Sequence, residues 1–175
     1  MTKAEILSET EGEPQTRPSI GGLSPAASAL APGLVWRRLE AWTAWRWGVR
    51  PVTWLAEGPG LFLPRIGPAT LGQVEEWRDG AWQAVTADPS PLGGVYLPGA
   101  TAYRIAADVG STETVPPEVA EAYRRLAEYL GQVQGDDAPG ATELQDGDYS
   151  IRRPAAWAAR ALAYSGAADL LRGFR

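Results

Sequence analysis

The sequence contains no histidine and no cysteine, and Lys3 is its only lysine. Zinc sites of the usual kind, disulfides, cysteine nucleophiles and histidine-based triads are therefore excluded. Histidine is also the most common general acid or base in enzymes, so its absence lowers the expectation of catalysis. We expect a protein that is not an enzyme, with no catalytic residue, no metal site and no cofactor.

Long apolar runs and an excess of positive charge are missing as well. No run approaches the roughly 18 apolar residues of a membrane-spanning helix, and the first residues lack the apolar stretch of a signal peptide. The net charge of −5 argues against nonspecific nucleic-acid binding as the main role, because phosphate neutralisation needs a basic surface. We therefore expect no membrane partner and no specific binding of DNA.

The rest of the composition is that of a globular protein. Hydrophobic residues make up 45% of the 175 residues and charged residues 21%, which suits one packed domain with tails. The 20 glycines and 15 prolines predict short elements separated by many turns.

Residues 1–33 have the composition of a flexible N-terminal arm. Acidic residues alternate with small polar ones from Glu9 to Glu13, and prolines and glycines follow from Pro14 onwards. The alternative interpretation is an arm that becomes ordered against a neighbouring subunit.

Helical spacing appears twice. Residues 34–48 are predicted to form a first helix, with an apolar stripe of Leu34, Leu39, Trp42 and Trp45. The pattern of residues 116–134 is clearer, because prolines and Glu118 precede apolar residues at 3–4 spacing. On its polar side, Glu121 and Arg125 are expected to pair across one turn.

Residues 52–109 read as strands and turns. Asp79-Gly80 between two strand-like segments is a strong hairpin signal. Tyr103 and Ile105 alternate with Arg104, as expected of a half-buried strand.

Residues 135–153 form a polar linker in this interpretation, and residues 154–175 a C-terminal helix and tail. Gly166 inside that helix predicts a kink or a close approach of another backbone. The aspartates of the linker do not have the spacing of an EF-hand calcium loop, so a solvated linker is favoured over weak cation binding. A carboxylate pair of Asp136 and Asp148 is the remaining enzymatic alternative, and no apolar wall flanks it to raise a pKa.

Together these patterns predict an α+β fold. We expect a small bundle of about three helices in residues 34–175, with an inserted antiparallel β-hairpin or sheet segment and an extended N-terminal arm.

Eight tryptophans in one chain exceed the needs of a small core. Large aromatic residues and arginines are favoured at protein interfaces. Trp36 and Trp47 lie off the apolar stripe of the first predicted helix, so they are candidates for subunit contact. The simpler interpretation of the arginine doublets is that they lie on solvated helix faces. The alternative interpretation is that they form salt bridges with a neighbouring subunit. The doublets considered as interface residues are Arg37-Arg38 and Arg124-Arg125.

Four stretches, taken in order, resemble the head–tail adaptor (connector) family of long-tailed phages and gene transfer agents. The best match is a tyrosine-arginine-apolar strand, a glycine and a helix that starts with valine-proline. The stretches are Leu39-Glu40-Ala41-Trp42-Thr43; Leu61-Phe62-Leu63-Pro64 with Val74 and Asp79-Gly80; Tyr103-Arg104-Ile105 with Gly110 and Val115-Pro116-Pro117-Glu118-Val119; and Arg160-Ala161-Leu162 with Ser165-Gly166-Ala167-Ala168, Leu170-Leu171 and Arg175.

The resemblance implies a structural virion protein of the phage neck, assembled in the host cytoplasm. Adaptors of this family form rings, commonly of twelve copies, beneath the portal protein. They extend the DNA channel, through which DNA passes without specific binding, and they present a docking surface to the next neck or tail protein. The C-terminal segment would reach the portal, through Tyr164, Leu170, Leu171, Phe174 and Arg175.

Two other functions stay open at this point. One is another neck component, such as a stopper or tail-completion protein. The other is a tryptophan-rich module that binds carbohydrate or another ligand through exposed rings on a β face.

Overall fold

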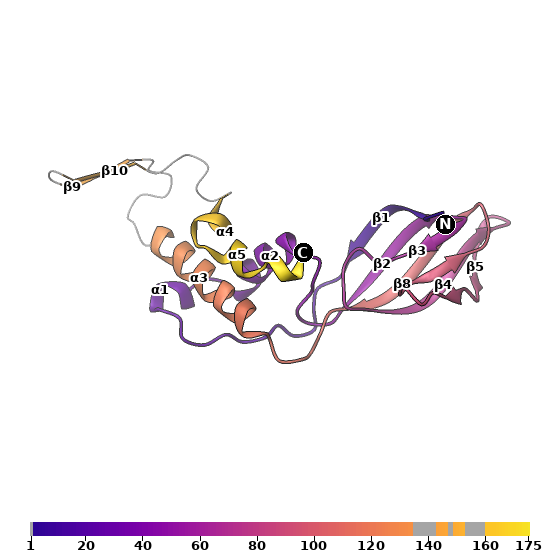
Figure 1. Cartoon of the computed structure of the whole chain (residues 1–175), viewed down its shortest axis with the longest axis horizontal. Coiled ribbons are helices and arrows are strands. Elements are labelled where there is room, and N and C mark those ends of the chain that lie inside the picture. The colour runs from indigo at the N-terminus through magenta and orange to yellow at the C-terminus, as the bar shows by residue number, and fades with distance from the viewer. Residues whose placement is uncertain (1, 135–142, 147–148, 153–159) are drawn as a thin grey trace. The chain divides into compact units, whose positions relative to one another are not determined.

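The computed structural model describes residues 2–134, 143–146, 149–152 and 160–175. The fold is mixed, with antiparallel sheets and few helices, which agrees with the predicted α+β class. The chain divides into two units rather than one domain with an arm. We call Met1–Arg17 with Ala44–Glu113 the β unit, and Pro18–Thr43 with Thr114–Arg175 the helical unit (Figure 1).

The β unit consists of two antiparallel sheets. The five-stranded sheet has the order β1-β2-β8-β4-β5, and the three-stranded sheet has the order β3-β7-β6. The strands are β1 (Glu5–Glu11), β2 (Arg50–Glu57), β3 (Gly60–Phe62), β4 (Ala69–Arg78), β5 (Ala81–Val85), β6 (Asp88–Pro89), β7 (Val95–Leu97) and β8 (Ala102–Val109).

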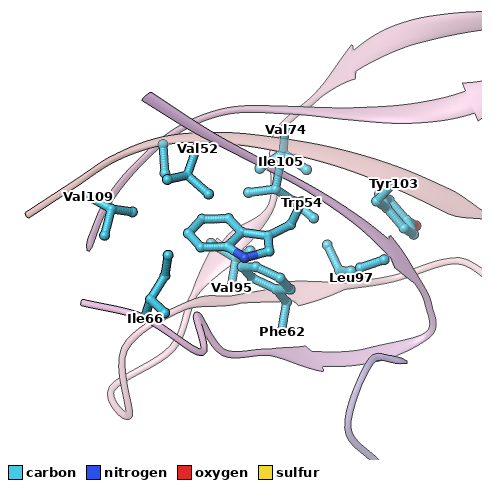
Figure 2. Close-up of a cluster of buried hydrophobic side chains, with 12 residues drawn as sticks. Val52, Trp54, Phe62, Ile66, Val74, Val95, Leu97, Tyr103, Ile105 and Val109 are labelled. Carbon is cyan, nitrogen blue, oxygen red and sulfur yellow. The ribbon is translucent and has the colours of Figure 1, made fainter. Parts of the chain in front are cut away.

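The core of the β unit lies between these two sheets. Side chains of β2 and β8 alternate between buried and more exposed positions, which is the pattern of strands with one face on a core. Trp54 of β2 lies at the centre of the buried cluster and packs against Phe62 of β3, with ring centroids 5.5 Å apart (Figure 2). The expected alternation of Tyr103, Arg104 and Ile105 is confirmed.

The predicted hairpin at Asp79-Gly80 is confirmed between β4 and β5. Both turn residues have positive φ angles, 53° at Asp79 and 78° at Gly80. This backbone matches the right-handed twist of paired strands, and Asp-Gly adopts it at low cost.

Residues 5–11 form strand β1, so the prediction that they belong to a flexible arm is wrong. Glu11 accepts hydrogen bonds from Arg46 Nε at 2.9 Å and Arg46 Nη2 at 2.8 Å, and lies 3.5 Å from Arg50 Nη1. The hydrogen bonds from Arg46 lower the pKa of Glu11. Glu9 accepts a hydrogen bond from the Trp54 indole. Alternating acidic residues suggested disorder, but two of these carboxylates attach β1 to the sheet.

The helical unit is built around α3. This helix spans Pro117–Gln134, as the sequence predicts, and contacts each of the other α-helices of the unit. Its buried residues include four of the predicted apolar face, Val119, Ala122, Leu126 and Leu130, together with Tyr123 and Ala127. The remaining elements are α1 (Pro25–Ser28), α2 (Pro32–Trp42), α4 (Ala161–Tyr164), α5 (Ala167–Leu170), the 3₁₀ helix η1 (Arg172–Phe174) and the paired strands β9 (Glu143–Asp146) and β10 (Tyr149–Arg152).

Helix α1 packs closely on α3 at Gly131. A Cβ atom at Gly131 would lie 2.7 Å from the backbone nitrogen of Ala27, so glycine is required by space rather than by backbone angle. Ser24 caps α1 by accepting from the Ala27 amide at 3.2 Å. Glu128 of α3 accepts from both the backbone amide and the hydroxyl of Ser24, at 2.7 Å each. Residues 18–33, also predicted to be an arm, are thus attached to α3.

Two predicted helices differ from those in the structure. Helix α2 ends at Trp42 instead of continuing to residue 48, because Thr43 has an extended backbone. The C-terminal segment contains two short helices, α4 and α5, separated by Gly166 with a φ of 74°. The predicted kink at Gly166 is therefore confirmed. Residues 153–159 and most of the predicted linker lie outside the described residues.

Candidate interaction surfaces

Trp36 and Trp47, predicted to contact another subunit, are both buried. The Trp36 indole donates to the Pro18 carbonyl at 3.1 Å, and its ring lies 4.9 Å from that of Tyr123. Both residues are core positions, so their assignment to an interface is wrong. The predicted apolar stripe therefore lay on the wrong side of the helix. Of its members in α2 only Leu39 is buried, and the other buried apolar residues are Val35 and Trp36.

The outer side of α2 instead exposes Leu34 and Trp42, with exposed fractions of 42% and 36%. Arg37 is exposed on the same helix, and Arg38 is half-buried between Leu34 and Trp42 in the i, i+4 series. The guanidinium of Arg175 lies 4.2 Å from the centroid of a Trp42 ring. We call Leu34, Arg37, Arg38 and Trp42 the α2 face. Its arginines were predicted as interface residues, but its apolar residues were predicted to be core.

Arg124 and Arg125 make ion pairs within the helical unit. Glu121 Oε1 lies 2.9 Å from Arg125 Nε, and Glu121 Oε2 lies 3.3 Å from Arg124 Nη1. These contacts lower the pKa of Glu121, mainly through the hydrogen bond from Arg125. Arg124 also donates to the Gly21 carbonyl at 3.0 Å. The predicted pair of Glu121 and Arg125 is confirmed, and the interface role of the doublet stays a prediction.

The five residues predicted to bind a portal differ in exposure. Leu171 is completely buried, so it supports the helical unit and is not available for a partner. Leu170 and Phe174 are half-buried. Tyr164 has an exposed fraction of 46%, with its ring 6.4 Å from that of Tyr129. Arg175 is exposed and stacks on Trp42.

The edge of the five-stranded sheet carries an acidic cluster that sequence inspection missed. Glu5 of β1 lies directly opposite Glu57 of β2. The register shifts between Ile6 and Ser8, and Leu7, at this bulge, has an exposed fraction of 55%. We call Glu5, Leu7 and Glu57 the acidic edge. Only the strand register brings Glu5 and Glu57 together, because they are far apart in sequence.

The outer face of the same sheet carries a pair of tryptophans. The rings of Trp77 and Trp82 lie 5.2 Å apart in an edge-to-face arrangement, with an interplanar angle of 66°. Arg104 lies 4.9 Å from the centroid of a Trp82 ring, and its Nε is 2.6 Å from Glu75 Oε2. This hydrogen bond lowers the pKa of Glu75 and raises that of Arg104. Because the rings are not coplanar, they do not form a continuous stacking platform.

A groove of about 750 Å³ opens beside β4, between β5 and the β6–β7 region. Its lining includes no charged side chain, and its polar side chains are those of Gln73, Thr86 and Ser90. None of these groups titrates near neutral pH, so the groove offers no general acid or base.

Within the described ranges, no three acidic residues come together as metal ligands, and no helix has the length and hydropathy to cross a membrane. Asp136, Asp137 and Asp148, considered above for cation binding or acid–base chemistry, lie outside the described residues.

Comparison with known proteins found no match: no family model, no curated protein and no solved structure is similar to this chain.

Proposed function

We propose that this protein is a non-enzymatic virion component, a head–tail adaptor that forms a ring beneath the portal of a long-tailed phage or related particle. The ring extends the DNA channel and provides the docking surface for a stopper or tail-completion protein. Assembly takes place in the host cytoplasm, and the mature location is the neck.

The observation that carries the proposal is the order of the elements along the chain from α2 onwards. The larger part of the β unit, Ala44–Glu113 with β2 to β8, lies between α2 and α3 of the helical unit, whereas β1 comes from residues that precede both helices. The family resemblance implies this order: a first helix, a β segment, a helix beginning at valine-proline and a C-terminal segment. In this proposal the small bundle of the adaptor corresponds to α3 with the helices that contact it, α2 and the C-terminal α4 and α5.

Exposed apolar residues beside arginines give further support. Trp, Tyr and Arg dominate the residues that carry binding energy at protein interfaces. The α2 face offers Trp42 with Arg37 and Arg38, and Tyr164 is exposed on α4. The acidic net charge suits a DNA channel, because like charge keeps DNA from adhering to the wall.

The test mixes the purified chain with candidate portal rings and measures the mass of the complex by light scattering. A mass that saturates at a fixed number of copies per portal is expected. Deletion of residues 172–175 removes Arg175 but keeps the buried Leu171, so it should abolish capture without unfolding the chain. A truncation after Ser165 is unsuitable, because it also removes the buried Ala167 and Leu171. Circular dichroism checks that the deletion variant is folded.

Other outcomes place the protein elsewhere. Binding to a stopper or tail-completion protein, with no portal capturing the chain, assigns it to a lower layer of the neck. Failure to bind any neck protein overturns the proposal.

The pair of exposed Trp77 and half-buried Trp82 favours a second candidate function, a module that binds carbohydrate or another ligand. Their edge-to-face angle allows one ring, not two, to stack on a flat ligand. Titration of a glycan panel while following tryptophan fluorescence tests this function, with Trp77→Ala as the control for site-specific signal. No spectral change across the panel excludes glycans as its ligands.

A further inference from the structure

The charged residues of the α2 face are both basic. Arg37 and Arg38 are its charged residues, and Glu40, the one acidic residue of α2, is buried. Leu34 and Trp42 lie four residues on either side of Arg38, so two apolar side chains and an arginine form one stripe along the helix. An apolar and cationic face on a chain of net charge −5 suits an acidic partner that also offers an apolar side chain.

The acidic edge has the complementary chemistry. Glu5 and Glu57 are opposed in the sheet, and like charges in that position destabilise a strand pair. Neither carboxylate has an ion-pair partner in the part of the chain that the structure describes. Leu7 is exposed at the bulge beside them, on β1, which is the edge strand of its sheet among the described residues. The side chain of Arg65 reaches this strand at the Ile6 carbonyl, 3.5 Å from Nη2. Edge strands of this kind are sites where another chain can be added.

We propose that the α2 face of one copy binds the acidic edge of the next copy. Arg37 and Arg38 neutralise Glu5 and Glu57, and Leu7 packs against Leu34 and Trp42. The inference rests on the proposed ring and specifies the contact that joins its subunits.

The symmetry of this contact agrees with a ring. Each copy carries one α2 face and one acidic edge, and the two surfaces differ, so the contact is heterologous. Heterologous contacts between identical subunits propagate from copy to copy and close when the rotation permits. The contact also offsets the repulsion between Glu5 and Glu57, so covering the acidic edge in the assembly is electrostatically favourable.

The natural absence of cysteine provides a direct test. Single-cysteine variants Leu7→Cys and Leu34→Cys are mixed and treated with a short bismaleimide crosslinker. Leu92→Cys is the matched control, because Leu92 is an exposed leucine of the β unit outside both surfaces. We expect the Leu7→Cys and Leu34→Cys pair to give roughly tenfold more crosslinked dimer than Leu92→Cys with Leu34→Cys, owing to the high effective concentration in a specific contact.

A charge exchange supplies the second arm. The variant Arg37→Glu/Arg38→Glu, with the cysteine at position 34, should lose the crosslink to Leu7→Cys. A partner variant that adds Glu5→Arg and Glu57→Arg should restore it. Restoration excludes misfolding as the cause of the loss, because a misfolded α2 would not regain its partner.

The outcomes separate this contact from the function of the protein. One outcome is that portal-bound rings have the expected mass, while the pair of positions 7 and 34 crosslinks no more than the Leu92→Cys control. That outcome overturns the contact but does not contradict the adaptor function. Crosslinking between positions 7 and 34 without capture by any portal supports the contact and counts against the adaptor function. Equal crosslinking for all cysteine pairs in solution and on portals overturns the contact as well.

Discussion

The β unit and the helical unit hold their cores in different ways. In the β unit, two sheets enclose one cluster that contains Trp54, Phe62 and Tyr103, and many strands share the contacts. In the helical unit, the other α-helices all pack on α3, whose neighbours are short. The first core depends on a large enclosed aromatic side chain, and the second depends on the surface of one helix. Substitutions can test this difference, beginning with the largest expected loss of stability.

Trp54→Ala should cause the largest loss of stability. Trp54 is buried between the sheets and donates from its indole to Glu9, so the substitution leaves a cavity and removes a bond to β1. We expect a decrease of about 3–5 kcal/mol in the free energy of unfolding, measured by urea denaturation. Trp77→Ala is the control, since Trp77 has an exposed fraction of 45%, and it should cost at most about 1 kcal/mol. Equal losses would show that Trp54 is not central to the β core.

Trp36→Ala applies the same test to the helical unit. Trp36 is buried against Tyr123 of α3, whereas Trp42 on the same helix faces outward. Trp36→Ala should reduce stability by about 3 kcal/mol, and Trp42→Ala by under about 1 kcal/mol, mostly the loss of its contact with Arg175. Thermal unfolding followed by circular dichroism compares the two. A larger effect at Trp42 would mean that α2 buries Trp42 rather than Trp36, as the sequence pattern predicted.

These two tryptophans show where sequence patterns suffice and where they do not. A strand has two faces, so the alternation at Tyr103, Arg104 and Ile105 fixed which side is buried. Helix α2 contains consecutive apolar residues at Leu34, Val35 and Trp36, so several phases fit the helical period equally well. Packing against α3 selects one of them, and that choice depends on a helix that follows some eighty positions later, roughly half the chain.

The candidate surfaces were predictable to a smaller extent. The arginines of the α2 face could be identified, because charged residues rarely lie in a core. The acidic edge could not, because it exists only through the pairing of β1 with β2. The N-terminal residues lack a helical or strongly apolar pattern, and their attachment depends on arginines that lie beyond α2, at Arg46 and Arg50.

Glu11→Gln tests that attachment through its pH dependence. The hydrogen bonds from Arg46 lower the folded-state pKa of Glu11 below its ordinary value of 4.5. The carboxylate therefore stabilises the fold above the ordinary value, and this contribution is lost as pH falls through the lowered folded-state value. Glu11→Gln should be less stable at neutral pH, by about 2–3 kcal/mol, and should lose less stability on acidification.

The control for this pH profile is Glu13→Gln. Glu13 is largely exposed and lies 3.8 Å from Arg17, so solvent weakens its ion pair and the change should be under about 1 kcal/mol. Urea unfolding from pH 3 to 7, roughly the range in which carboxylates titrate, gives the free energy of unfolding as a function of pH. If this free energy falls equally with pH in Glu11→Gln and in the natural chain, the role of Glu11 is contradicted.

Gly131→Ala should have an intermediate effect in the helical unit. Alanine favours helix over glycine by about 1 kcal/mol. Its Cβ, however, would collide with the backbone of α1, and such overpacking costs about 1–3 kcal/mol, which outweighs the gain in helix propensity. Gly173→Ala is the control, because a Cβ there meets nothing within 4 Å. Thermal unfolding should show a lower midpoint for Gly131→Ala alone. A raised midpoint would mean that α1 yields easily and contributes little to the core around α3.

Ser24→Ala should have the smallest effect, because it removes side-chain bonds at one end of a short helix. The Ser24 hydroxyl accepts from the Ala27 amide and donates to Glu128, while the Ser24 backbone amide still donates to Glu128 in the variant. Loss of the cap should cost about 1 kcal/mol, a decrease of roughly 2–4 °C in the thermal midpoint. Ser28→Ala, at the other end of α1, should leave the midpoint unchanged. If Ser24→Ala instead costs as much as Trp36→Ala, the stability of the helical unit depends on α1 as strongly as on the packing of α2, and α3 is not its single organising element.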